Sequence, residues 1–382
     1  DFSYTIDERR VVLKMADLPC KTPDDVLNSE LFVEIVQRFI EKLDDQRSPL
    51  LGMVGMASLK RKGKQVSEAA QLMAKVFRML LSHRAEGVGE HAPELTPLFA
   101  SKARLVEFMD KLYDFWRDFE RFLIYETAAD DSRDRSVEGH QAFVAATEDL
   151  RSLVLRAFRR VSSNLQGHWP RVYRNVPAGV NMGLLVDKID WTCPGGVYSF
   201  LKEIPFVRLA SMQLPVVFYP RRNYRKGQFK PVTENPLEGV SFDPSEWYCM
   251  PLNVGPLLIL TFFHQEYLGL GSSLINLFEL AGHNDARKQP DGILVFGIEP
   301  GQLGEGETVF YEDDTQNLVV GAISRCEDVD YFGYFKKMIL TLHNVIMIRR
   351  GKLPIHGAMC RIELKDGSAA NVVIVGDSGA GK

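Results

Sequence analysis

The chain has 382 residues, of which 45% are hydrophobic and 25% charged, a composition typical of an ordinary globular protein of roughly two or three domains. Its net charge of −4 excludes a broadly basic surface, so we expect no nucleic-acid partner and no anionic membrane partner. The longest apolar run, at 257–263, is too short to cross a bilayer, and no signal-peptide pattern is visible. Five cysteines without a CxxC pair argue against disulfides and zinc and favour a reducing, cytoplasmic compartment.

The first part of the chain is expected to be helical. Thr22-Pro23-Asp24-Asp25 supplies an N-cap residue, a proline at the first helical position and acids in the first turn. Apolar residues at helical spacing predict helices over about 23–43, 66–81, 105–123 and 141–161. The aromatic stripe of the third helix is more typical of a bundle core than of a cofactor box. We therefore predict a helical bundle across residues 1–165, without catalytic residues and with a surface open to a protein partner.

The second half has a different composition, with frequent Pro and Gly and short apolar runs rich in β-branched and aromatic residues. Strands are predicted at 197–201, 214–219, 257–263, 293–296 and 318–323. Helices are predicted at 274–280 and 332–348. A strand pair is predicted at 356–364 and 371–375, joined by a turn at 365–368. This half is therefore expected to be mixed α/β, with a substrate-side domain over 166–330 and the start of a nucleotide-binding domain over 331–382.

A phosphate-binding loop is the strongest motif in the sequence. A wholly apolar strand at 372–375 runs into Gly376, Asp377, Ser378, Gly379, Ala380, Gly381 and Lys382, which match the GxxxxGK core of a Walker A loop. The glycines let several backbone N–H groups face one anion, and the lysine places a charge against the outer phosphates. We expect this loop to bind ATP, GTP or pyrophosphate. The alternative is a glycine-rich turn that binds nothing.

A second motif precedes the loop. Tyr331, Gly333 and the lysine pair that ends at Lys337 resemble the tyrosine-x-glycine-x-x-lysine-lysine motif of ATP-dependent phosphoenolpyruvate carboxykinases. His356 lies where that family places its histidine before the P-loop strand. The resemblance covers about residues 318–382. It implies a carboxykinase-like fold for this part of the chain, with a P-loop at its end.

The resemblance also implies a role for each matching position. Lys337, as a neutral amine, and His356 would be ligands of a catalytic Mn²⁺, with Mg²⁺ accompanying the nucleotide. Tyr331 would lie beside phosphoenolpyruvate, and Lys382 would contact the transferred phosphate, so that Lys337 and Lys382 are the catalytic lysines. A lysine binds a cation only when it is deprotonated, which needs burial or a nearby positive charge.

Two departures from the carboxykinase pattern leave the exact family open. Met338 replaces the glycine that normally follows the lysine pair, and Gly357-Ala358 replaces a Cys-Ser pair after the histidine. The His-Gly strand and the GDSGxGK loop instead resemble HPr kinase/phosphorylase, a related family that lacks the lysine-pair motif. Residues 318–382 are thus identified with the superfamily that contains both.

A carboxylate substrate also calls for an arginine, since a guanidinium group matches a carboxylate. The densest basic cluster is Arg221-Arg222-Asn223-Tyr224-Arg225-Lys226, and Arg222 is the preferred candidate. A solvated basic loop is the competing interpretation.

Three functions remain open from the sequence. The first is a metal-dependent phosphotransferase that converts oxaloacetate and a nucleoside triphosphate to phosphoenolpyruvate, CO₂ and the diphosphate. The second is a kinase of a hydroxyl group on a small molecule or protein, as in HPr kinase. The third is a non-catalytic, nucleotide-gated regulatory or scaffold protein. Because a P-loop needs the helix that follows it, we also expect the native chain to continue past Lys382 with Ser or Thr, and the 382-residue chain alone to show no turnover.

Overall fold

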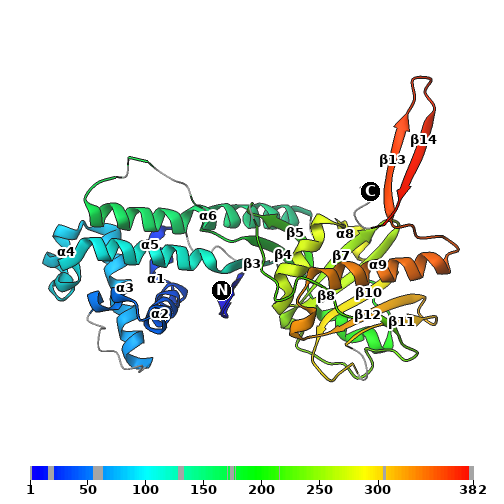
Figure 1. The fold of residues 1–382 in the computed structure, drawn as a ribbon, viewed down its shortest axis with the longest axis horizontal. Helices are drawn as coiled ribbons and strands as arrows, with labels where there is room; N and C mark the ends of the chain where they lie inside the picture. The colour runs from blue at the N-terminus through cyan, green and yellow to red at the C-terminus, as the bar shows by residue number, and fades with distance from the viewer. Residues whose placement is uncertain are drawn as a thin grey trace. The chain divides into compact units, whose positions relative to one another are not determined.

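The computed structural model describes residues 2–15, 21–54, 63–127, 133–169, 171–172, 176, 178–214, 216–303 and 307–377. The chain divides into two compact units, each built from two segments. Unit 1 comprises Asp1–Ile189 and Pro205–Tyr219, and unit 2 comprises Asp190–Ile204 and Pro220–Lys382. Both units contain helices and strands, so the α/β class expected from the sequence is confirmed (Figure 1). None of the helices in the described ranges is both long enough and apolar enough to cross a membrane.

Unit 1 combines helices with strands. Its elements are β1 (Phe2–Ile6), β2 (Arg10–Met15), α1 (Pro23–Asn28), α2 (Glu30–Asp45), η1 (Pro49–Val54), α3 (Gly63–Ser82), α4 (Ala85–His91), η2 (Pro93–Ser101), α5 (Lys102–Asp118), β3 (Glu120–Glu126), α6 (Arg133–Gln166), β4 (Met182–Asp187) and β5 (Phe206–Met212). The strands pair in the order β1-β2-β3-β4-β5, with β2-β3-β4 parallel and both outer pairs antiparallel.

The prediction that residues 1–165 form a helical bundle is wrong in part, because this range also contains the strands β1, β2 and β3. Two of the predicted helices also differ from the structure. The first predicted helix is divided at Ser29, which follows α1 and caps α2 by accepting a hydrogen bond from the Phe32 N–H at 3.1 Å. The third ends at Asp118, and Phe122 and Leu123 lie on β3 instead. Residues 120–125 are buried between two parallel strands. A short apolar run that is buried on both faces cannot be distinguished from a helical stripe by its periodicity.

The core of unit 1 is aromatic where its helices meet. Phe77 of α3 lies between Phe32 of α2 and Phe158 of α6, with ring-centroid distances of 5.4 and 5.6 Å. Phe39 of α2 meets Phe108 of α5 edge-on at 5.1 Å. Edge-on and tilted ring pairs of this kind stabilise a core beyond the area that they bury. The aromatic stripe is therefore used for packing, as predicted.

Unit 2 is a mixed sheet with a long helix on one face. Its elements are η3 (Gly196–Glu203), β6 (Lys230–Pro231), η4 (Pro244–Glu246), β7 (Trp247–Val254), β8 (Leu257–His264), η5 (Gln265–Tyr267), α7 (Leu268–Ser272), η6 (Ser273–Asn276), β9 (Glu279–Leu280), α8 (His283–Ala286), β10 (Gly292–Ile298), β11 (Thr308–Asp313), β12 (Leu318–Ser324), η7 (Glu327–Val329), α9 (Phe332–Arg349), β13 (Gly357–Glu363) and β14 (Ala369–Val375). The order is β7-β8-β10-β12-β11-β6, and β9 pairs with β7.

The centre of this sheet is parallel. β10 pairs in parallel with both β8 and β12, whereas β7 and β11 flank them in antiparallel orientation. Helix α9 packs on β10 and β12, and its Phe335 ring stacks on Phe296 of β10 with centroids 3.7 Å apart. Gly321 of β12 allows this approach, because a Cβ there would lie 2.8 Å from Met338 Cγ.

The predicted strands of unit 2 are confirmed at 257–263, 293–296 and 318–323, as are the helix at 332–348 and the strand pair with its turn. The strand predicted at 197–201 is wrong, because these residues form the 3-10 helix η3. The strand predicted at 214–219 is also wrong where the structure describes it, since β5 ends at Met212. The helix predicted at 274–280 is replaced by η6 and β9. All three predictions rested on short apolar runs, for which the periodic signal is ambiguous.

Candidate phosphate and carboxylate site

The sequence predicted to be a phosphate-binding loop follows an exposed β-hairpin. β13 and β14 pair antiparallel with Gly357 opposite Val375, and Gly376 and Asp377 continue from the end of β14. A Cβ on Gly357 would lie 2.5 Å from the Ile374 carbonyl oxygen, so the glycine of the His-Gly sequence is needed where the two strands approach. The other loop residues predicted to bind phosphate, Ser378, Gly379, Ala380, Gly381 and Lys382, lie outside the described residues.

The other end of the hairpin is closed by a specific turn. Asp366 Oδ1 accepts hydrogen bonds from the Ser368 backbone N–H at 2.9 Å and from the Ser368 hydroxyl at 2.6 Å, and these bonds hold the pKa of Asp366 below its usual value. Gly367 adopts a φ of 84°, which a residue with a side chain rarely adopts. The turn thus sets the register of the strand that leads into the P-loop.

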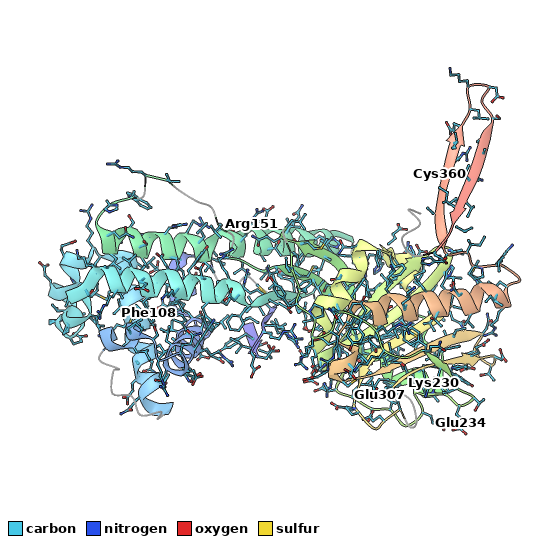
Figure 2. All side chains as sticks on the ribbon, viewed as in Figure 1. Phe108, Arg151, Lys230, Glu234, Glu307 and Cys360 are labelled. Carbon is cyan, nitrogen blue, oxygen red and sulfur yellow. The ribbon has the colours of Figure 1, made fainter. Side chains whose placement is uncertain are left out.

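Both faces of the hairpin are exposed. One face carries only apolar side chains, from the cross-strand pairs Ala358/Ile374, Cys360/Val372 and Ile362/Ala370. Ile362 and Ile374 are each 46% exposed. Figure 2 shows the hairpin with its side chains and labels Cys360 on β13. The lone pair of strands is the least covered part of unit 2 that the structure describes.

Tyr331 lies at the N-cap position of α9. Its ring lies against the first helical turn, because a Cβ on Gly333 would be only 2.3 Å from Tyr331 Cε1. The tyrosine-x-glycine spacing therefore has a local structural reason: the glycine leaves room for the tyrosine ring. Tyr331 itself is half-buried.

The two predicted metal ligands are both exposed. Lys337 lies on the second turn of α9, and His356 lies in the connection before β13. Within the described part of the chain, no hydrogen bond or ion pair joins their side chains. The described part of the chain also contains no group of three or more His, Cys, Asp or Glu residues placed to hold a metal ion. The metal site formed by Lys337 and His356 stays a prediction.

Arg222 and Tyr331 lie on segments that contact each other. Arg222 Nε lies 2.9 Å from Asp328 Oδ1, and the Arg222 N–H donates to the carbonyl of Asp330, the residue before Tyr331, at 3.1 Å. The hydrogen bond from Arg222 lowers the pKa of Asp328, and the same bond raises the pKa of Arg222. The predicted substrate arginine is therefore held beside the start of α9, with its side chain still 36% exposed.

A charged cluster at the ends of the parallel strands was not predicted from the sequence. His264 is the last residue of β8, Glu299 follows β10, and Arg325 follows β12. Because these strands are parallel, their carboxyl ends meet at one edge, where ligands of open α/β sheets commonly bind. The signal was a histidine, a glutamate and an arginine within three residues of the ends of three correctly predicted apolar strands. Recognising it required knowing that the strands are parallel neighbours.

His264 is at the centre of this cluster. It is 7% exposed, its Nδ1 accepts from the Glu266 N–H at 3.2 Å, and its Nε2 lies 3.3 Å from Glu246 Oε2. Arg325 Nη1 is 3.0 Å from Nε2 and 3.3 Å from Nδ1, so it lies over the ring. Arg325 also pairs with Glu299 and with Glu266.

The electrostatics of the cluster favour a neutral imidazole. Burial lowers the pKa of His264, the charge of Arg325 lowers it further, and Glu246 opposes both effects. With Nδ1 accepting from the backbone, the proton belongs on Nε2 and points to Glu246. Arg325 thus connects the carboxyl ends of β8, β10 and β12, because it contacts His264 and pairs with Glu299.

Comparison of the whole chain with protein-family models, with curated proteins and with solved structures finds no match in any of the three.

Proposed function

We propose that this protein binds a nucleoside triphosphate at the loop after β14 and is a metal-dependent phosphotransferase of the phosphoenolpyruvate carboxykinase type. The observation that carries the proposal is strand β14, whose apolar run at 372–375 ends at Val375 and is followed directly by the GDSGAGK sequence. A strand that leads into a glycine-rich loop with a terminal lysine is the context in which such a loop binds phosphate.

The other residues are assigned by the same proposal. The loop from Gly376 to Lys382 would surround the phosphates with backbone N–H groups, and Lys382 would neutralise their charge. Arg222 and Tyr331 would bind the carboxylate substrate, because their segments are bound to each other. Lys337 and His356 would hold Mn²⁺, and because Lys337 is exposed, the positive charge that keeps its amine neutral would have to come from the metal and from Lys382. The metal would stabilise the charge that develops on the transferred phosphoryl group.

The nucleotide claim is tested by calorimetric titration of ATP, GTP and pyrophosphate with Mg²⁺ into the full chain. Lys382→Ala should weaken binding at least about tenfold, since it removes a charge from the phosphates. Lys365→Ala makes the same substitution at the opposite end of the same hairpin and should bind like the unchanged protein. Equal affinities of the unchanged protein and Lys382→Ala would contradict the proposal.

An HPr-kinase-like activity is the second candidate, favoured by the His-Gly sequence whose glycine allows the close approach of β13 to β14. Assays of phosphoryl transfer separate the candidates. Formation of phosphoenolpyruvate from oxaloacetate supports the carboxykinase, and phosphorylation of a serine-containing acceptor supports the kinase. Nucleotide binding without transfer does not by itself favour a regulatory or scaffold protein, because we expect no turnover from the 382-residue chain alone.

A further inference from the structure

The basic loop at 221–226 is already bound by carboxylates of the same chain. Arg222 Nε lies 2.9 Å from Asp328 Oδ1, and Lys226 Nζ lies 3.4 Å from Asp328 Oδ2. Glu327 Oε2 approaches the Nη2 atom of Arg222 at the longer distance of 3.8 Å. The two oxygens of Asp328 thus bridge two cationic side chains, which is the way in which a small carboxylate would bind to this loop.

The ion pair between Arg222 and Asp328 is open to solvent. Their side chains are 36% and 42% exposed, and the Lys226 side chain is 55% exposed. Ion pairs at this exposure are weak, because water and dissolved ions screen their charges. A carboxylate in solution can therefore reach both cations and replace Asp328 there.

We infer that Asp328 competes with the carboxylate substrate for Arg222. A guanidinium group binds one carboxylate through two parallel N–H···O bonds, and Asp328 already accepts the bond from the Nε–H of this group. The substrate therefore binds in exchange for Asp328, and this exchange lowers the affinity of the loop for carboxylates. This role of Asp328 rests on the proposed function, in which Arg222 binds the substrate carboxylate.

Malonate, a stable dicarboxylate, is the probe, and its binding to the full chain is followed through the NMR signals of the amides and arginine Nε–H groups at 221–226. Asp328→Asn should tighten malonate binding about two- to fivefold, which corresponds to the strength of an exposed ion pair. Glu327→Gln is the matched control, because it removes the same charge from the same segment but its carboxylate lies farther from Arg222; it should tighten binding less. All titrations use one ionic strength, because salt screens these charges.

Arg222→Gln separates the role of Asp328 from that of Arg222. It should weaken malonate binding, and it should remove the advantage of Asp328→Asn when the two substitutions are combined. Malonate binding that is undetectable, or that Arg222→Gln leaves unchanged, would contradict the substrate role of Arg222 and with it the competition. If Arg222→Gln weakens binding but Asp328→Asn binds malonate no more tightly than Glu327→Gln or the unchanged protein, the competition alone is overturned.

Discussion

Arg222 Nε lies 2.9 Å from Asp328 Oδ1, and this pair connects the basic loop at 221–226 to the segment that begins α9. The neighbouring backbone makes the same connection, since the N–H of Arg221 donates to Asp330 Oδ2 at 3.0 Å. Lys226 reaches the same acidic segment through Asp328. The loop is therefore held against the residues that precede Tyr331, which gives the proposed substrate residues a common support.

Removing the acidic partner should release this loop. We expect Asp328→Asn to speed hydrogen exchange of the amides at 221–226 by several-fold, because Lys226 and Arg222 lose their ion pairs with Asp328 and Arg222 keeps only the longer one with Glu327. Asp314→Asn is the control, since Asp314 is an exposed carboxylate that pairs with Arg349 at the other end of α9. Exchange that is as slow in Asp328→Asn as in the control would show that the ion pairs do not hold the loop.

The metal site can be tested by titrating Mn²⁺ into the protein and its histidine variants. His356→Ala should lower the Mn²⁺ affinity at least about tenfold, because even indirect support of a metal ligand is worth about 10–100-fold. His343→Ala is a matched control: His343 is a partly exposed histidine of α9, and its Nδ1 lies 3.2 Å from Oδ1 of the adjacent Asn344. Indistinguishable affinities of His356→Ala and His343→Ala would refute the ligand assignment.

The cluster around His264 predicts a pH dependence of stability. The pKa of His264 is lowered in the folded state, so the unfolded chain binds the proton first as the pH falls below about 6.5. The free energy of unfolding should therefore decrease from about pH 6.5 toward the folded-state pKa, and be independent of this group at higher pH. The charged groups that face the ring are Glu246, Glu266 and Arg325.

Urea unfolding of the unchanged protein and of His264→Gln, between about pH 5 and pH 7.5, measures this contribution. The glutamine retains a donor for Glu246 but does not titrate, so the slope with pH should be smaller in the variant. His343→Gln should keep the original slope. A slope that is the same in all three proteins would contradict the assignment of a neutral, buried His264.

The buried Arg121 should stabilise unit 1 through its hydrogen bonds to backbone carbonyls. It is 4% exposed and donates to the carbonyls of Gly179, Trp116, Arg117 and Phe119. Burial lowers its pKa to about 10. Arg121→Met leaves these acceptors unpaired and should cost about 3 kcal/mol of unfolding free energy. Arg117→Met, at a more exposed position of the preceding helix, should cost less than about 1 kcal/mol in the same denaturant titration. Equal losses would mean that the carbonyl contacts contribute little.

Long elements with a consistent periodic pattern were predictable from the sequence. Helix α9 and the strands β8, β10 and β12 lie close to their predicted bounds. The turn before β14 was also predictable, because Asp366 and Gly367 have local conformational preferences that need no distant partner. The glycine-rich loop was also recognisable from the sequence, because the residues that define its pattern are adjacent in the chain.

The positions of charged residues far apart in the sequence were decided by the tertiary structure. His264 and Arg325 are 61 residues apart, and they meet only because β8, β10 and β12 are parallel neighbours whose carboxyl ends share an edge. Arg222 and Asp328 are 106 residues apart, and they meet because the loop at 221–226 is hydrogen-bonded to the segment before α9. Strand β3 is an example within unit 1. Its residues have a helix-like apolar pattern, yet they form a strand between β2 and β4. Local sequence determines which conformation a segment prefers, whereas pairing between distant segments determines which side chains meet and can override that preference.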